Sequence, residues 1–198
     1  MIQETPPPVP PASPARNGVV HRLLMERPVL FDEIHRESGL IGKSLIFLTL
    51  IAVLGGFYGL AMGSFSSASQ ALSSAAKVPL LLVGVMAFCL PALYVFNILL
   101  GSRLGFMQVT TLLMMSTAVI AILLAAFAPI TFFCVLTGAG YEFFVIENVA
   151  CFSIAGFFGL DYLWKGTRRV SAARGGERDM TILAGWIVVY VLLGTQLA

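Results

Sequence analysis

Apolar residues occur in this chain as five long runs, and charged residues are nearly absent from each run. Runs of about 20 apolar residues match the thickness of the hydrocarbon core of a bilayer when they are helical. We therefore predict an all-α fold, a polytopic transmembrane helical bundle. Its five spans are expected at residues 44–62, 78–100, 109–130, 143–164 and 181–197.

The pattern before the first apolar run is different. Residues 1–18 are rich in proline, which favours extended chain, and we predict a disordered cytoplasmic tail. A polyproline ligand for a partner is the alternative. Residues 19–43 are amphipathic and predict a cytoplasmic segment that lies on the membrane, docks on a partner or caps the bundle. No apolar signal peptide precedes the transmembrane domain at 44–198, so we expect the first span to direct insertion.

Three features interrupt the apolar runs. Residues 63–77 are small and polar and predict a loop. Pro91 lies inside the second span, where it removes a backbone hydrogen bond and predicts a kink. Residues 131–141 are apolar but are broken by Gly138 and Gly140, so they either extend the third helix or form a short re-entrant piece.

Composition supports a membrane protein. Hydrophobic residues make up 58% of the 198 residues and charged residues only 11%, whereas soluble domains carry about 25% charged residues. The net charge of +2 is too small to indicate nucleic acid as a partner. The three cysteines form no CxxC pair and are expected to be buried thiols. They are Cys89, Cys134 and Cys151.

The basic residues near the predicted spans predict the orientation. Lys77 is the one basic residue on one side, and the other side carries nine. These nine are Arg27, Arg36, Lys43, Arg103, Lys165, Arg168, Arg169, Arg174 and Arg178. Because basic loops stay in the cytoplasm, we predict a cytoplasmic N-terminus and a C-terminus outside. In a bacterium this would be the inner membrane.

Small residues recur at intervals of four in two spans, a spacing that lets helices approach closely. The positions are Gly55, Gly59 and Gly63 in the first span, and Cys151, Ala155 and Gly159 in the fourth. They predict helix-packing faces. Packing within the chain and an interface with a second copy or with a partner helix are both compatible with this spacing.

Glu147 is the sharpest candidate for a functional side chain, because an ionisable group within a span is costly and usually serves a function. Transport or proton relay is one interpretation. A structural polar contact near the outer membrane face is the other, with Lys77 as an available partner.

Three further polar residues fall near the predicted cytoplasmic ends of the spans and could form a cluster there. They are Asn97, Gln108 and Asp161. Interhelical hydrogen bonds of this kind are mostly structural. Asp161 is also four residues before Lys165, the spacing of a helical ion pair.

Motifs for chemistry are lacking. The chain has no HExxH, GxSxG or P-loop pattern, and its two histidines, His21 and His35, precede the first span. We therefore predict no catalytic residues, no metal ligands and no cofactor.

The layout of a cytoplasmic segment followed by closely spaced spans resembles the Yip family of membrane proteins. The resemblance covers about residues 44–197 and is carried by KVPLL at residues 77–81 and CLPALYVFN at residues 89–97. It implies a five-span scaffold or adaptor that recruits other proteins, without catalytic residues.

Three functions are compared on these grounds. The first is a non-enzymatic integral membrane scaffold or accessory subunit, with the lipid bilayer and other membrane proteins, or a second copy, as partners. The second is a small transporter or channel component that uses Glu147 in a helical bundle. The third, an enzyme acting on lipid, is supported only by the basic loop near the headgroups, which could attract anionic lipid.

Overall fold

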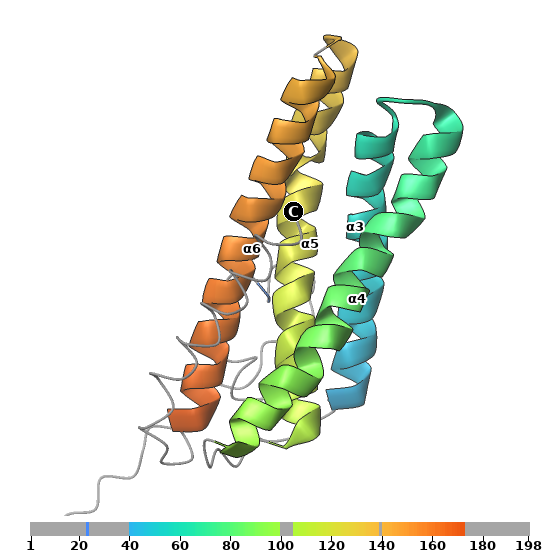
Figure 1. Ribbon diagram of the computed structural model, residues 1–198. Helices are drawn as coiled ribbons and strands as arrows, with labels where there is room; N and C mark the ends of the chain where they lie inside the picture. Colours follow the sequence, from blue (N-terminus) through green and yellow to red (C-terminus); the bar gives the residue numbers. More distant parts are fainter. Residues whose placement is uncertain (1–22, 24–39, 100–104, 139, 173–198) are drawn as a thin grey trace, which may run out of the picture.

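The computed structural model describes residues 23, 40–99, 105–138 and 140–172, and these residues form four α-helices without a strand (Figure 1). The helices are α3 (Leu40–Gly63), α4 (Ala68–Leu99), α5 (Phe106–Leu136) and α6 (Tyr141–Ala172). Each of the four is long and apolar enough to cross a membrane. The predicted all-helical fold is confirmed, and four such helices are those of a multi-pass membrane protein.

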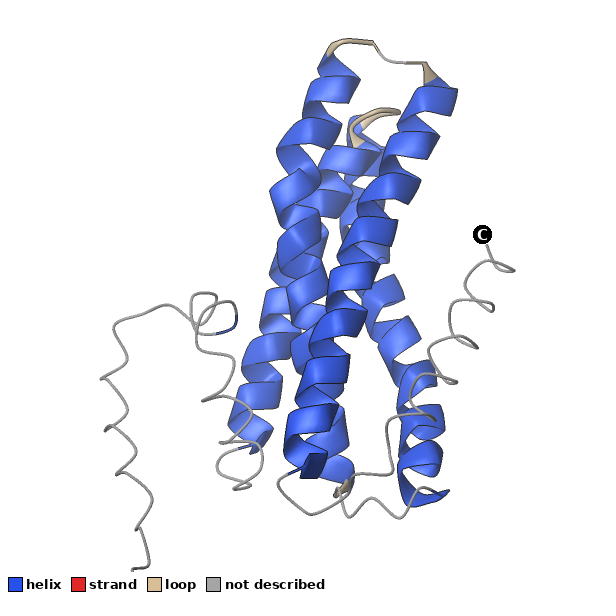
Figure 2. Cartoon of the chain, turned by 90° about the vertical axis from the view of Figure 1, so that its left-hand side faces the viewer, coloured by secondary structure: helices blue, strands red, loops and turns tan. Residues whose placement is uncertain are grey.

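The helices run up and down in sequence order. The α3–α4 and α5–α6 connections lie together at one end, called here the hairpin end, and the starts of α3 and α5 lie at the other (Figures 1 and 2). Helix α3 packs against both α4 and α5, and α6 packs against α5. As a result α3 and α5 form the centre of the bundle, while α4 and α6 lie at its edges.

Apolar side chains fill the space between the helices. Tyr58 and Ile51 of α3 are fully buried, and α5 contributes the largest set of buried residues. Apolar side chains also cover the outside, such as Phe88 of α4 and Phe157 of α6, which are 85% and 70% exposed. Such a surface suits contact with lipid chains rather than with water.

The predicted loop at 63–77 is wrong for residues 68–77, because α4 begins at Ala68. The hydroxyl oxygen of Ser67 accepts a hydrogen bond from the backbone N–H of Gln70 at 3.2 Å, as an N-cap does. The following residues include several alanines, the strongest helix formers. The polar composition of these residues predicts a loop. Capping by Ser67 and the helix propensity of alanine instead make them the first ten residues of α4.

The two alternatives for residues 131–141 are also decided. Residues 131–136 extend α5, and the backbone N–H of Thr137 bonds the carbonyl of Phe133 at the helix end. Gly138 then adopts a left-handed conformation with φ of 69°, which favours glycine. The segment is a helix extension followed by a turn, so the re-entrant alternative is wrong.

The predicted kink at Pro91, the fifth span and the N-terminal segments stay predictions. Helix α4 continues through Pro91 and Pro79, and the kink at Pro91 stays a prediction. The fifth span at 181–197, the tail at 1–18 and nearly all of 19–39 lie outside the described residues. Leu23 is the exception: it is fully buried, and its carbonyl accepts a hydrogen bond from the Tyr162 hydroxyl at 3.0 Å.

Candidate functional site

Five polar side chains from three helices meet near the hairpin end, and we call them the Glu147 cluster. Tyr58 comes from α3 and Thr131 from α5, and α6 supplies the other three, Glu147, Asn148 and Cys151. Tyr58 and Thr131 each precede the end of their helix by five residues, and Glu147 follows the start of α6 by six. The cluster therefore lies about 8–9 Å inside the bundle.

The carboxyl group of Glu147 accepts three hydrogen bonds. Its Oε1 accepts from the Thr131 hydroxyl at 2.8 Å and from the Cys151 thiol at 3.2 Å. Its Oε2 accepts from the side-chain amide of Asn148 at 3.2 Å. The side chain is half-buried, and all three donors are neutral.

Tyr58 and Asn148 link α3 to α6. The Tyr58 hydroxyl donates to Asn148 Oδ1 at 2.8 Å, and Asn148 Nδ2 donates both to the Phe144 carbonyl at 2.8 Å and to Glu147. The Phe152 ring meets the Tyr58 ring edge-to-face, with centroids 5.6 Å apart. These contacts fix the orientation of the Asn148 amide, whose nitrogen must face Glu147.

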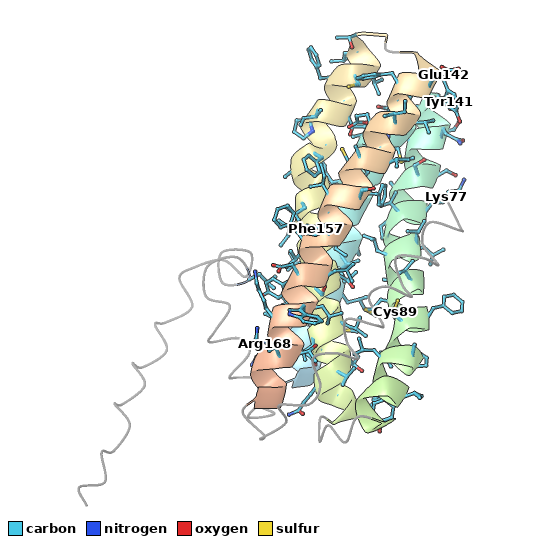
Figure 3. All side chains as sticks on the ribbon, turned by 60° about the vertical axis from the view of Figure 1, so that its left-hand side comes forward. Lys77, Cys89, Tyr141, Glu142, Phe157 and Arg168 are labelled. Carbon is cyan, nitrogen blue, oxygen red and sulfur yellow. The ribbon has the colours of Figure 1, made fainter. Side chains whose placement is uncertain are left out.

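Three aromatic rings, called here the aromatic cap, lie between the cluster and the hairpin end. Phe65 in the α3–α4 connection stacks on Phe144 with centroids 4.5 Å apart, and its centroid is 6.3 Å from that of Tyr141. Tyr141 and Glu142 mark this end of α6 in Figure 3. Phe144 precedes Glu147 by three residues, so the cap joins the two hairpins about one helical turn closer to the hairpin end than Glu147.

Lys77, the partner considered for Glu147, does not reach it. Lys77 is exposed on α4, away from α6 (Figure 3). Helix α4 lies at the other edge of the bundle and packs on α3 and α5. No ion pair joins Lys77 to Glu147 in the part of the chain that the structure describes, so the carboxyl relies on neutral donors.

The polar residues near the other end are not shown as one cluster. Gln108 accepts a hydrogen bond from the backbone N–H of Gly105 at 3.1 Å, at the start of α5. Asp161 pairs with Lys165 at 2.6 Å, as their spacing predicts. The side chain of Asn97 lies outside the described residues.

The small-residue stripe of α3 packs within the chain. A Cβ added to Gly59 would collide with the backbone carbonyl of Ser74 in α4, and one added to Gly63 would lie 2.5 Å from the Cα of Ala71. Gly55 of α3 lies against Pro79 and Leu82 of α4. The close approach of α3 and α4 therefore needs glycine at two of the three positions.

The small residues of α6 are buried, and Gly159 faces α5. Cys151, Ala155 and Gly159 are all buried. The Ser116 hydroxyl donates to the Gly159 carbonyl at 2.5 Å, and a Cβ on Gly159 would collide with the side chain of Ile120. This stripe brings the α6 backbone within hydrogen-bonding distance of α5.

Sequence reasoning identified Glu147 but missed three of its companions. Tyr58, Thr131 and Asn148 are ordinary residues in apolar runs, and nothing in their spacing along the chain links them. The available signal was that polar side chains in a membrane span need partners on neighbouring helices. Among the described residues, no group of three His, Cys, Asp or Glu side chains could hold a metal ion.

Known proteins offer no guide to this arrangement. Comparisons of the chain with models of protein families, with curated proteins and with solved structures found no match.

Proposed function

We propose that the protein is a non-enzymatic integral membrane scaffold or accessory subunit of a membrane complex. The observation that supports this best is the use of its interior polar groups. Tyr58 bonds Asn148, Thr131 bonds Glu147 and Ser116 bonds the Gly159 carbonyl, and each bond joins two helices. Interior polar groups that bond to one another across helices favour a stable frame, as a scaffold needs.

The outer faces are the expected contact surfaces for partners. Helices α4 and α6 lie at the two edges of the bundle and do not cover one another. Both carry large exposed apolar side chains, including Phe88 and Leu80 on α4 and Phe157 and Ile146 on α6. Lipid, another membrane protein or a second copy could cover these faces, and a scaffold needs such faces at its periphery.

The proposal includes the orientation of the bundle in the membrane and a fifth span. Lys43, Lys165 and Arg168 lie at the end opposite the hairpin end, and we assign that end to the cytoplasm. A fifth span at 181–197 would then bring the C-terminus outside. The resemblance of residues 44–197 to the Yip family points to the same five-span recruiting role.

The test is purification of the tagged full chain from its native membrane in mild detergent, with quantitative mass spectrometry. A scaffold or accessory subunit is expected to bring one or a few membrane proteins in constant stoichiometry. Because α3 begins at Leu40, deletion of residues 19–39 removes most of the amphipathic segment (19–43) while sparing that helix. We expect this deletion to lose the partners, since the segment is the expected docking arm.

Deletion of residues 1–18 serves as the matched control and should retain the partners. The deletion of 19–39 also removes the Leu23 carbonyl that binds Tyr162, so helix content and monodispersity must be checked first. A clean homo-oligomer without other proteins would contradict the accessory role. Unchanged partners after the 19–39 deletion would contradict the docking arm.

One observation favours the second candidate, a small transporter or channel component. Glu147 is a half-buried carboxyl within a helix that is apolar enough to span a membrane. If the bundle carries ions, Glu147→Gln is expected to abolish flux in liposomes, while Glu142→Gln, at the exposed start of α6, should not. Flux that survives Glu147→Gln would remove the reason for this candidate.

A further inference from the structure

Glu147 has a complete set of hydrogen-bond partners in both of its protonation states. As an anion, its Oε1 accepts from Thr131 and Cys151 and its Oε2 accepts from Asn148. The Thr131 oxygen also lies 3.4 Å from the carbonyl of Phe127, one turn earlier in α5. The Thr131 hydroxyl hydrogen can therefore point to either of two acceptors.

We propose that the Glu147 cluster is a reversible proton-binding site in which the Thr131 hydroxyl turns as the proton binds. The proton forms an O–H bond at Glu147 Oε1 and is donated to the Thr131 oxygen across the same 2.8 Å. The Thr131 hydrogen turns at the same time to the Phe127 carbonyl. No covalent bond breaks in the protein, and the incoming proton comes from water.

The rest of the cluster holds the carboxyl in place during this exchange. Asn148 Nδ2 continues to donate to Oε2, which becomes the carbonyl oxygen of the protonated acid. Tyr58 acts as a positioning residue. Its hydroxyl donates a hydrogen bond to Asn148 Oδ1, and this orients the amide so that Nδ2 faces Glu147. Both protonation states therefore retain the links from α6 to α3 and α5.

No cationic side chain lies beside Glu147 among the described residues. The titratable side chains near it are Tyr58 from α3, Cys134 from α5 and Cys151 from α6. None of these is a cation, and Lys77 on α4 is not in contact. A proton, rather than a side-chain cation, is therefore the charge partner that the contacts of this site leave room for.

The aromatic cap marks the end from which the proton is expected to enter. Glu147 lies about 9 Å from the start of α6 and about 38 Å from its other end. The Phe65 ring, stacked on Phe144, lies at this nearer end. Phe65 belongs to a four-residue connection rather than to a helix, so it is the part of the cap that can move most easily.

The test is infrared difference spectroscopy of the full chain in lipid vesicles, titrated from acidic to alkaline pH. The C=O stretching band of a protonated carboxyl is expected to appear at low pH and to shift in deuterium oxide. Because the chain has ten Asp and Glu residues, the Glu147 band is the part of this signal that Glu147→Gln removes and that Glu142→Gln retains. Glutamine keeps an acceptor oxygen and the side-chain shape, so the bundle is expected to fold.

Thr131→Val tests the hydroxyl exchange and keeps the shape of the side chain. Loss of the hydroxyl partner is expected to raise the frequency of the Glu147 band. Thr110→Val is the matched control, because the Thr110 hydroxyl also bonds the carbonyl four residues earlier but lies on the exposed side of α5. A pH-dependent carboxyl signal that Glu147→Gln leaves unchanged, or a Glu147 band whose frequency is unchanged in Thr131→Val, would each overturn the proposal.

This inference goes beyond the scaffold role and is tested by a different observable. Loss of the proton site would leave the partner measurement untouched, and loss of partners would leave the infrared band untouched. The two failures are therefore distinguishable.

Discussion

The two hairpins of this bundle are held together in different ways. In the α3–α4 hairpin, Gly59 and Gly63 let the backbones of the two helices touch, and the contact atoms belong to Ser74 and Ala71. In the α5–α6 hairpin, side chains form hydrogen bonds across the interface, from Ser116 in the first half of α5 and from Thr131 near its end. One interface depends on the absence of side chains, and the other depends on particular ones.

The difference shows two solutions to the same problem. Lipid chains are as apolar as leucine, so helices in a membrane gain little from apolar contact alone and associate through close packing or hydrogen bonds. The glycine interface is rigid, because backbone atoms have no rotamers to change. The polar interface can rearrange hydrogens without moving helices, and Glu147 lies within it.

The largest effect is expected from Gly59→Ala. The new Cβ would overlap the Ser74 carbonyl, a backbone atom that cannot turn away, so α3 and α4 must separate. We expect a loss of about 2–3 kcal/mol in the free energy of unfolding in mixed micelles. Reversible denaturation followed by circular dichroism would measure it.

Gly84→Ala is the matched control for that substitution. Nothing lies within 4 Å of the Cβ position of Gly84 in α4, so the change should alter stability by at most about 1 kcal/mol through helix propensity. Equal losses at the two positions would show that close packing between α3 and α4 is not what makes Gly59 necessary.

A smaller effect is expected from Ser116→Ala in the polar hairpin. The variant loses the hydrogen bond from α5 to the Gly159 carbonyl of α6 but leaves the volume nearly unchanged. We expect a loss of about 1 kcal/mol, the usual size of an interhelical hydrogen bond in a membrane. Ser153→Ala is the comparison, because Ser153 bonds only the Val149 carbonyl of its own helix, and little change is expected there.

The smallest effect is expected from Asp161→Asn. The Asp161–Lys165 pair lies on the exposed side of α6, where solvent and salt weaken the attraction. We expect at most about 0.5 kcal/mol, falling further at high salt. A loss as large as that of Ser116→Ala would mean that this end of α6 is more enclosed than its exposure indicates.

The sequence predicted the helical membrane fold and four of the spans, because apolar length is a direct physical requirement of the bilayer. It misplaced the start of α4, since capping by Ser67 depends on a single hydrogen bond that polarity does not reveal. It also left residues 131–141 open, and the left-handed Gly138 decides that case.

The site was predictable only in its central residue. Glu147 stands out because it is ionisable within an apolar run. Tyr58 is 89 residues away along the chain and Thr131 is 16 residues away, and only the packing of α3 and α6 on α5 brings them together. Lys77 was considered on grounds of charge alone, whereas the order of the helices across the bundle separates it from α6.

Hydrogen bonds between interior polar side chains join the helices of this bundle into one frame. A double-mutant cycle of Tyr58→Phe and Asn148→Leu, with unfolding measured in mixed micelles, tests it most directly, because these two residues alone make the 2.8 Å bond between α3 and α6. We predict a coupling energy of about 0.6–2 kcal/mol. Strictly additive effects of the two substitutions would contradict it.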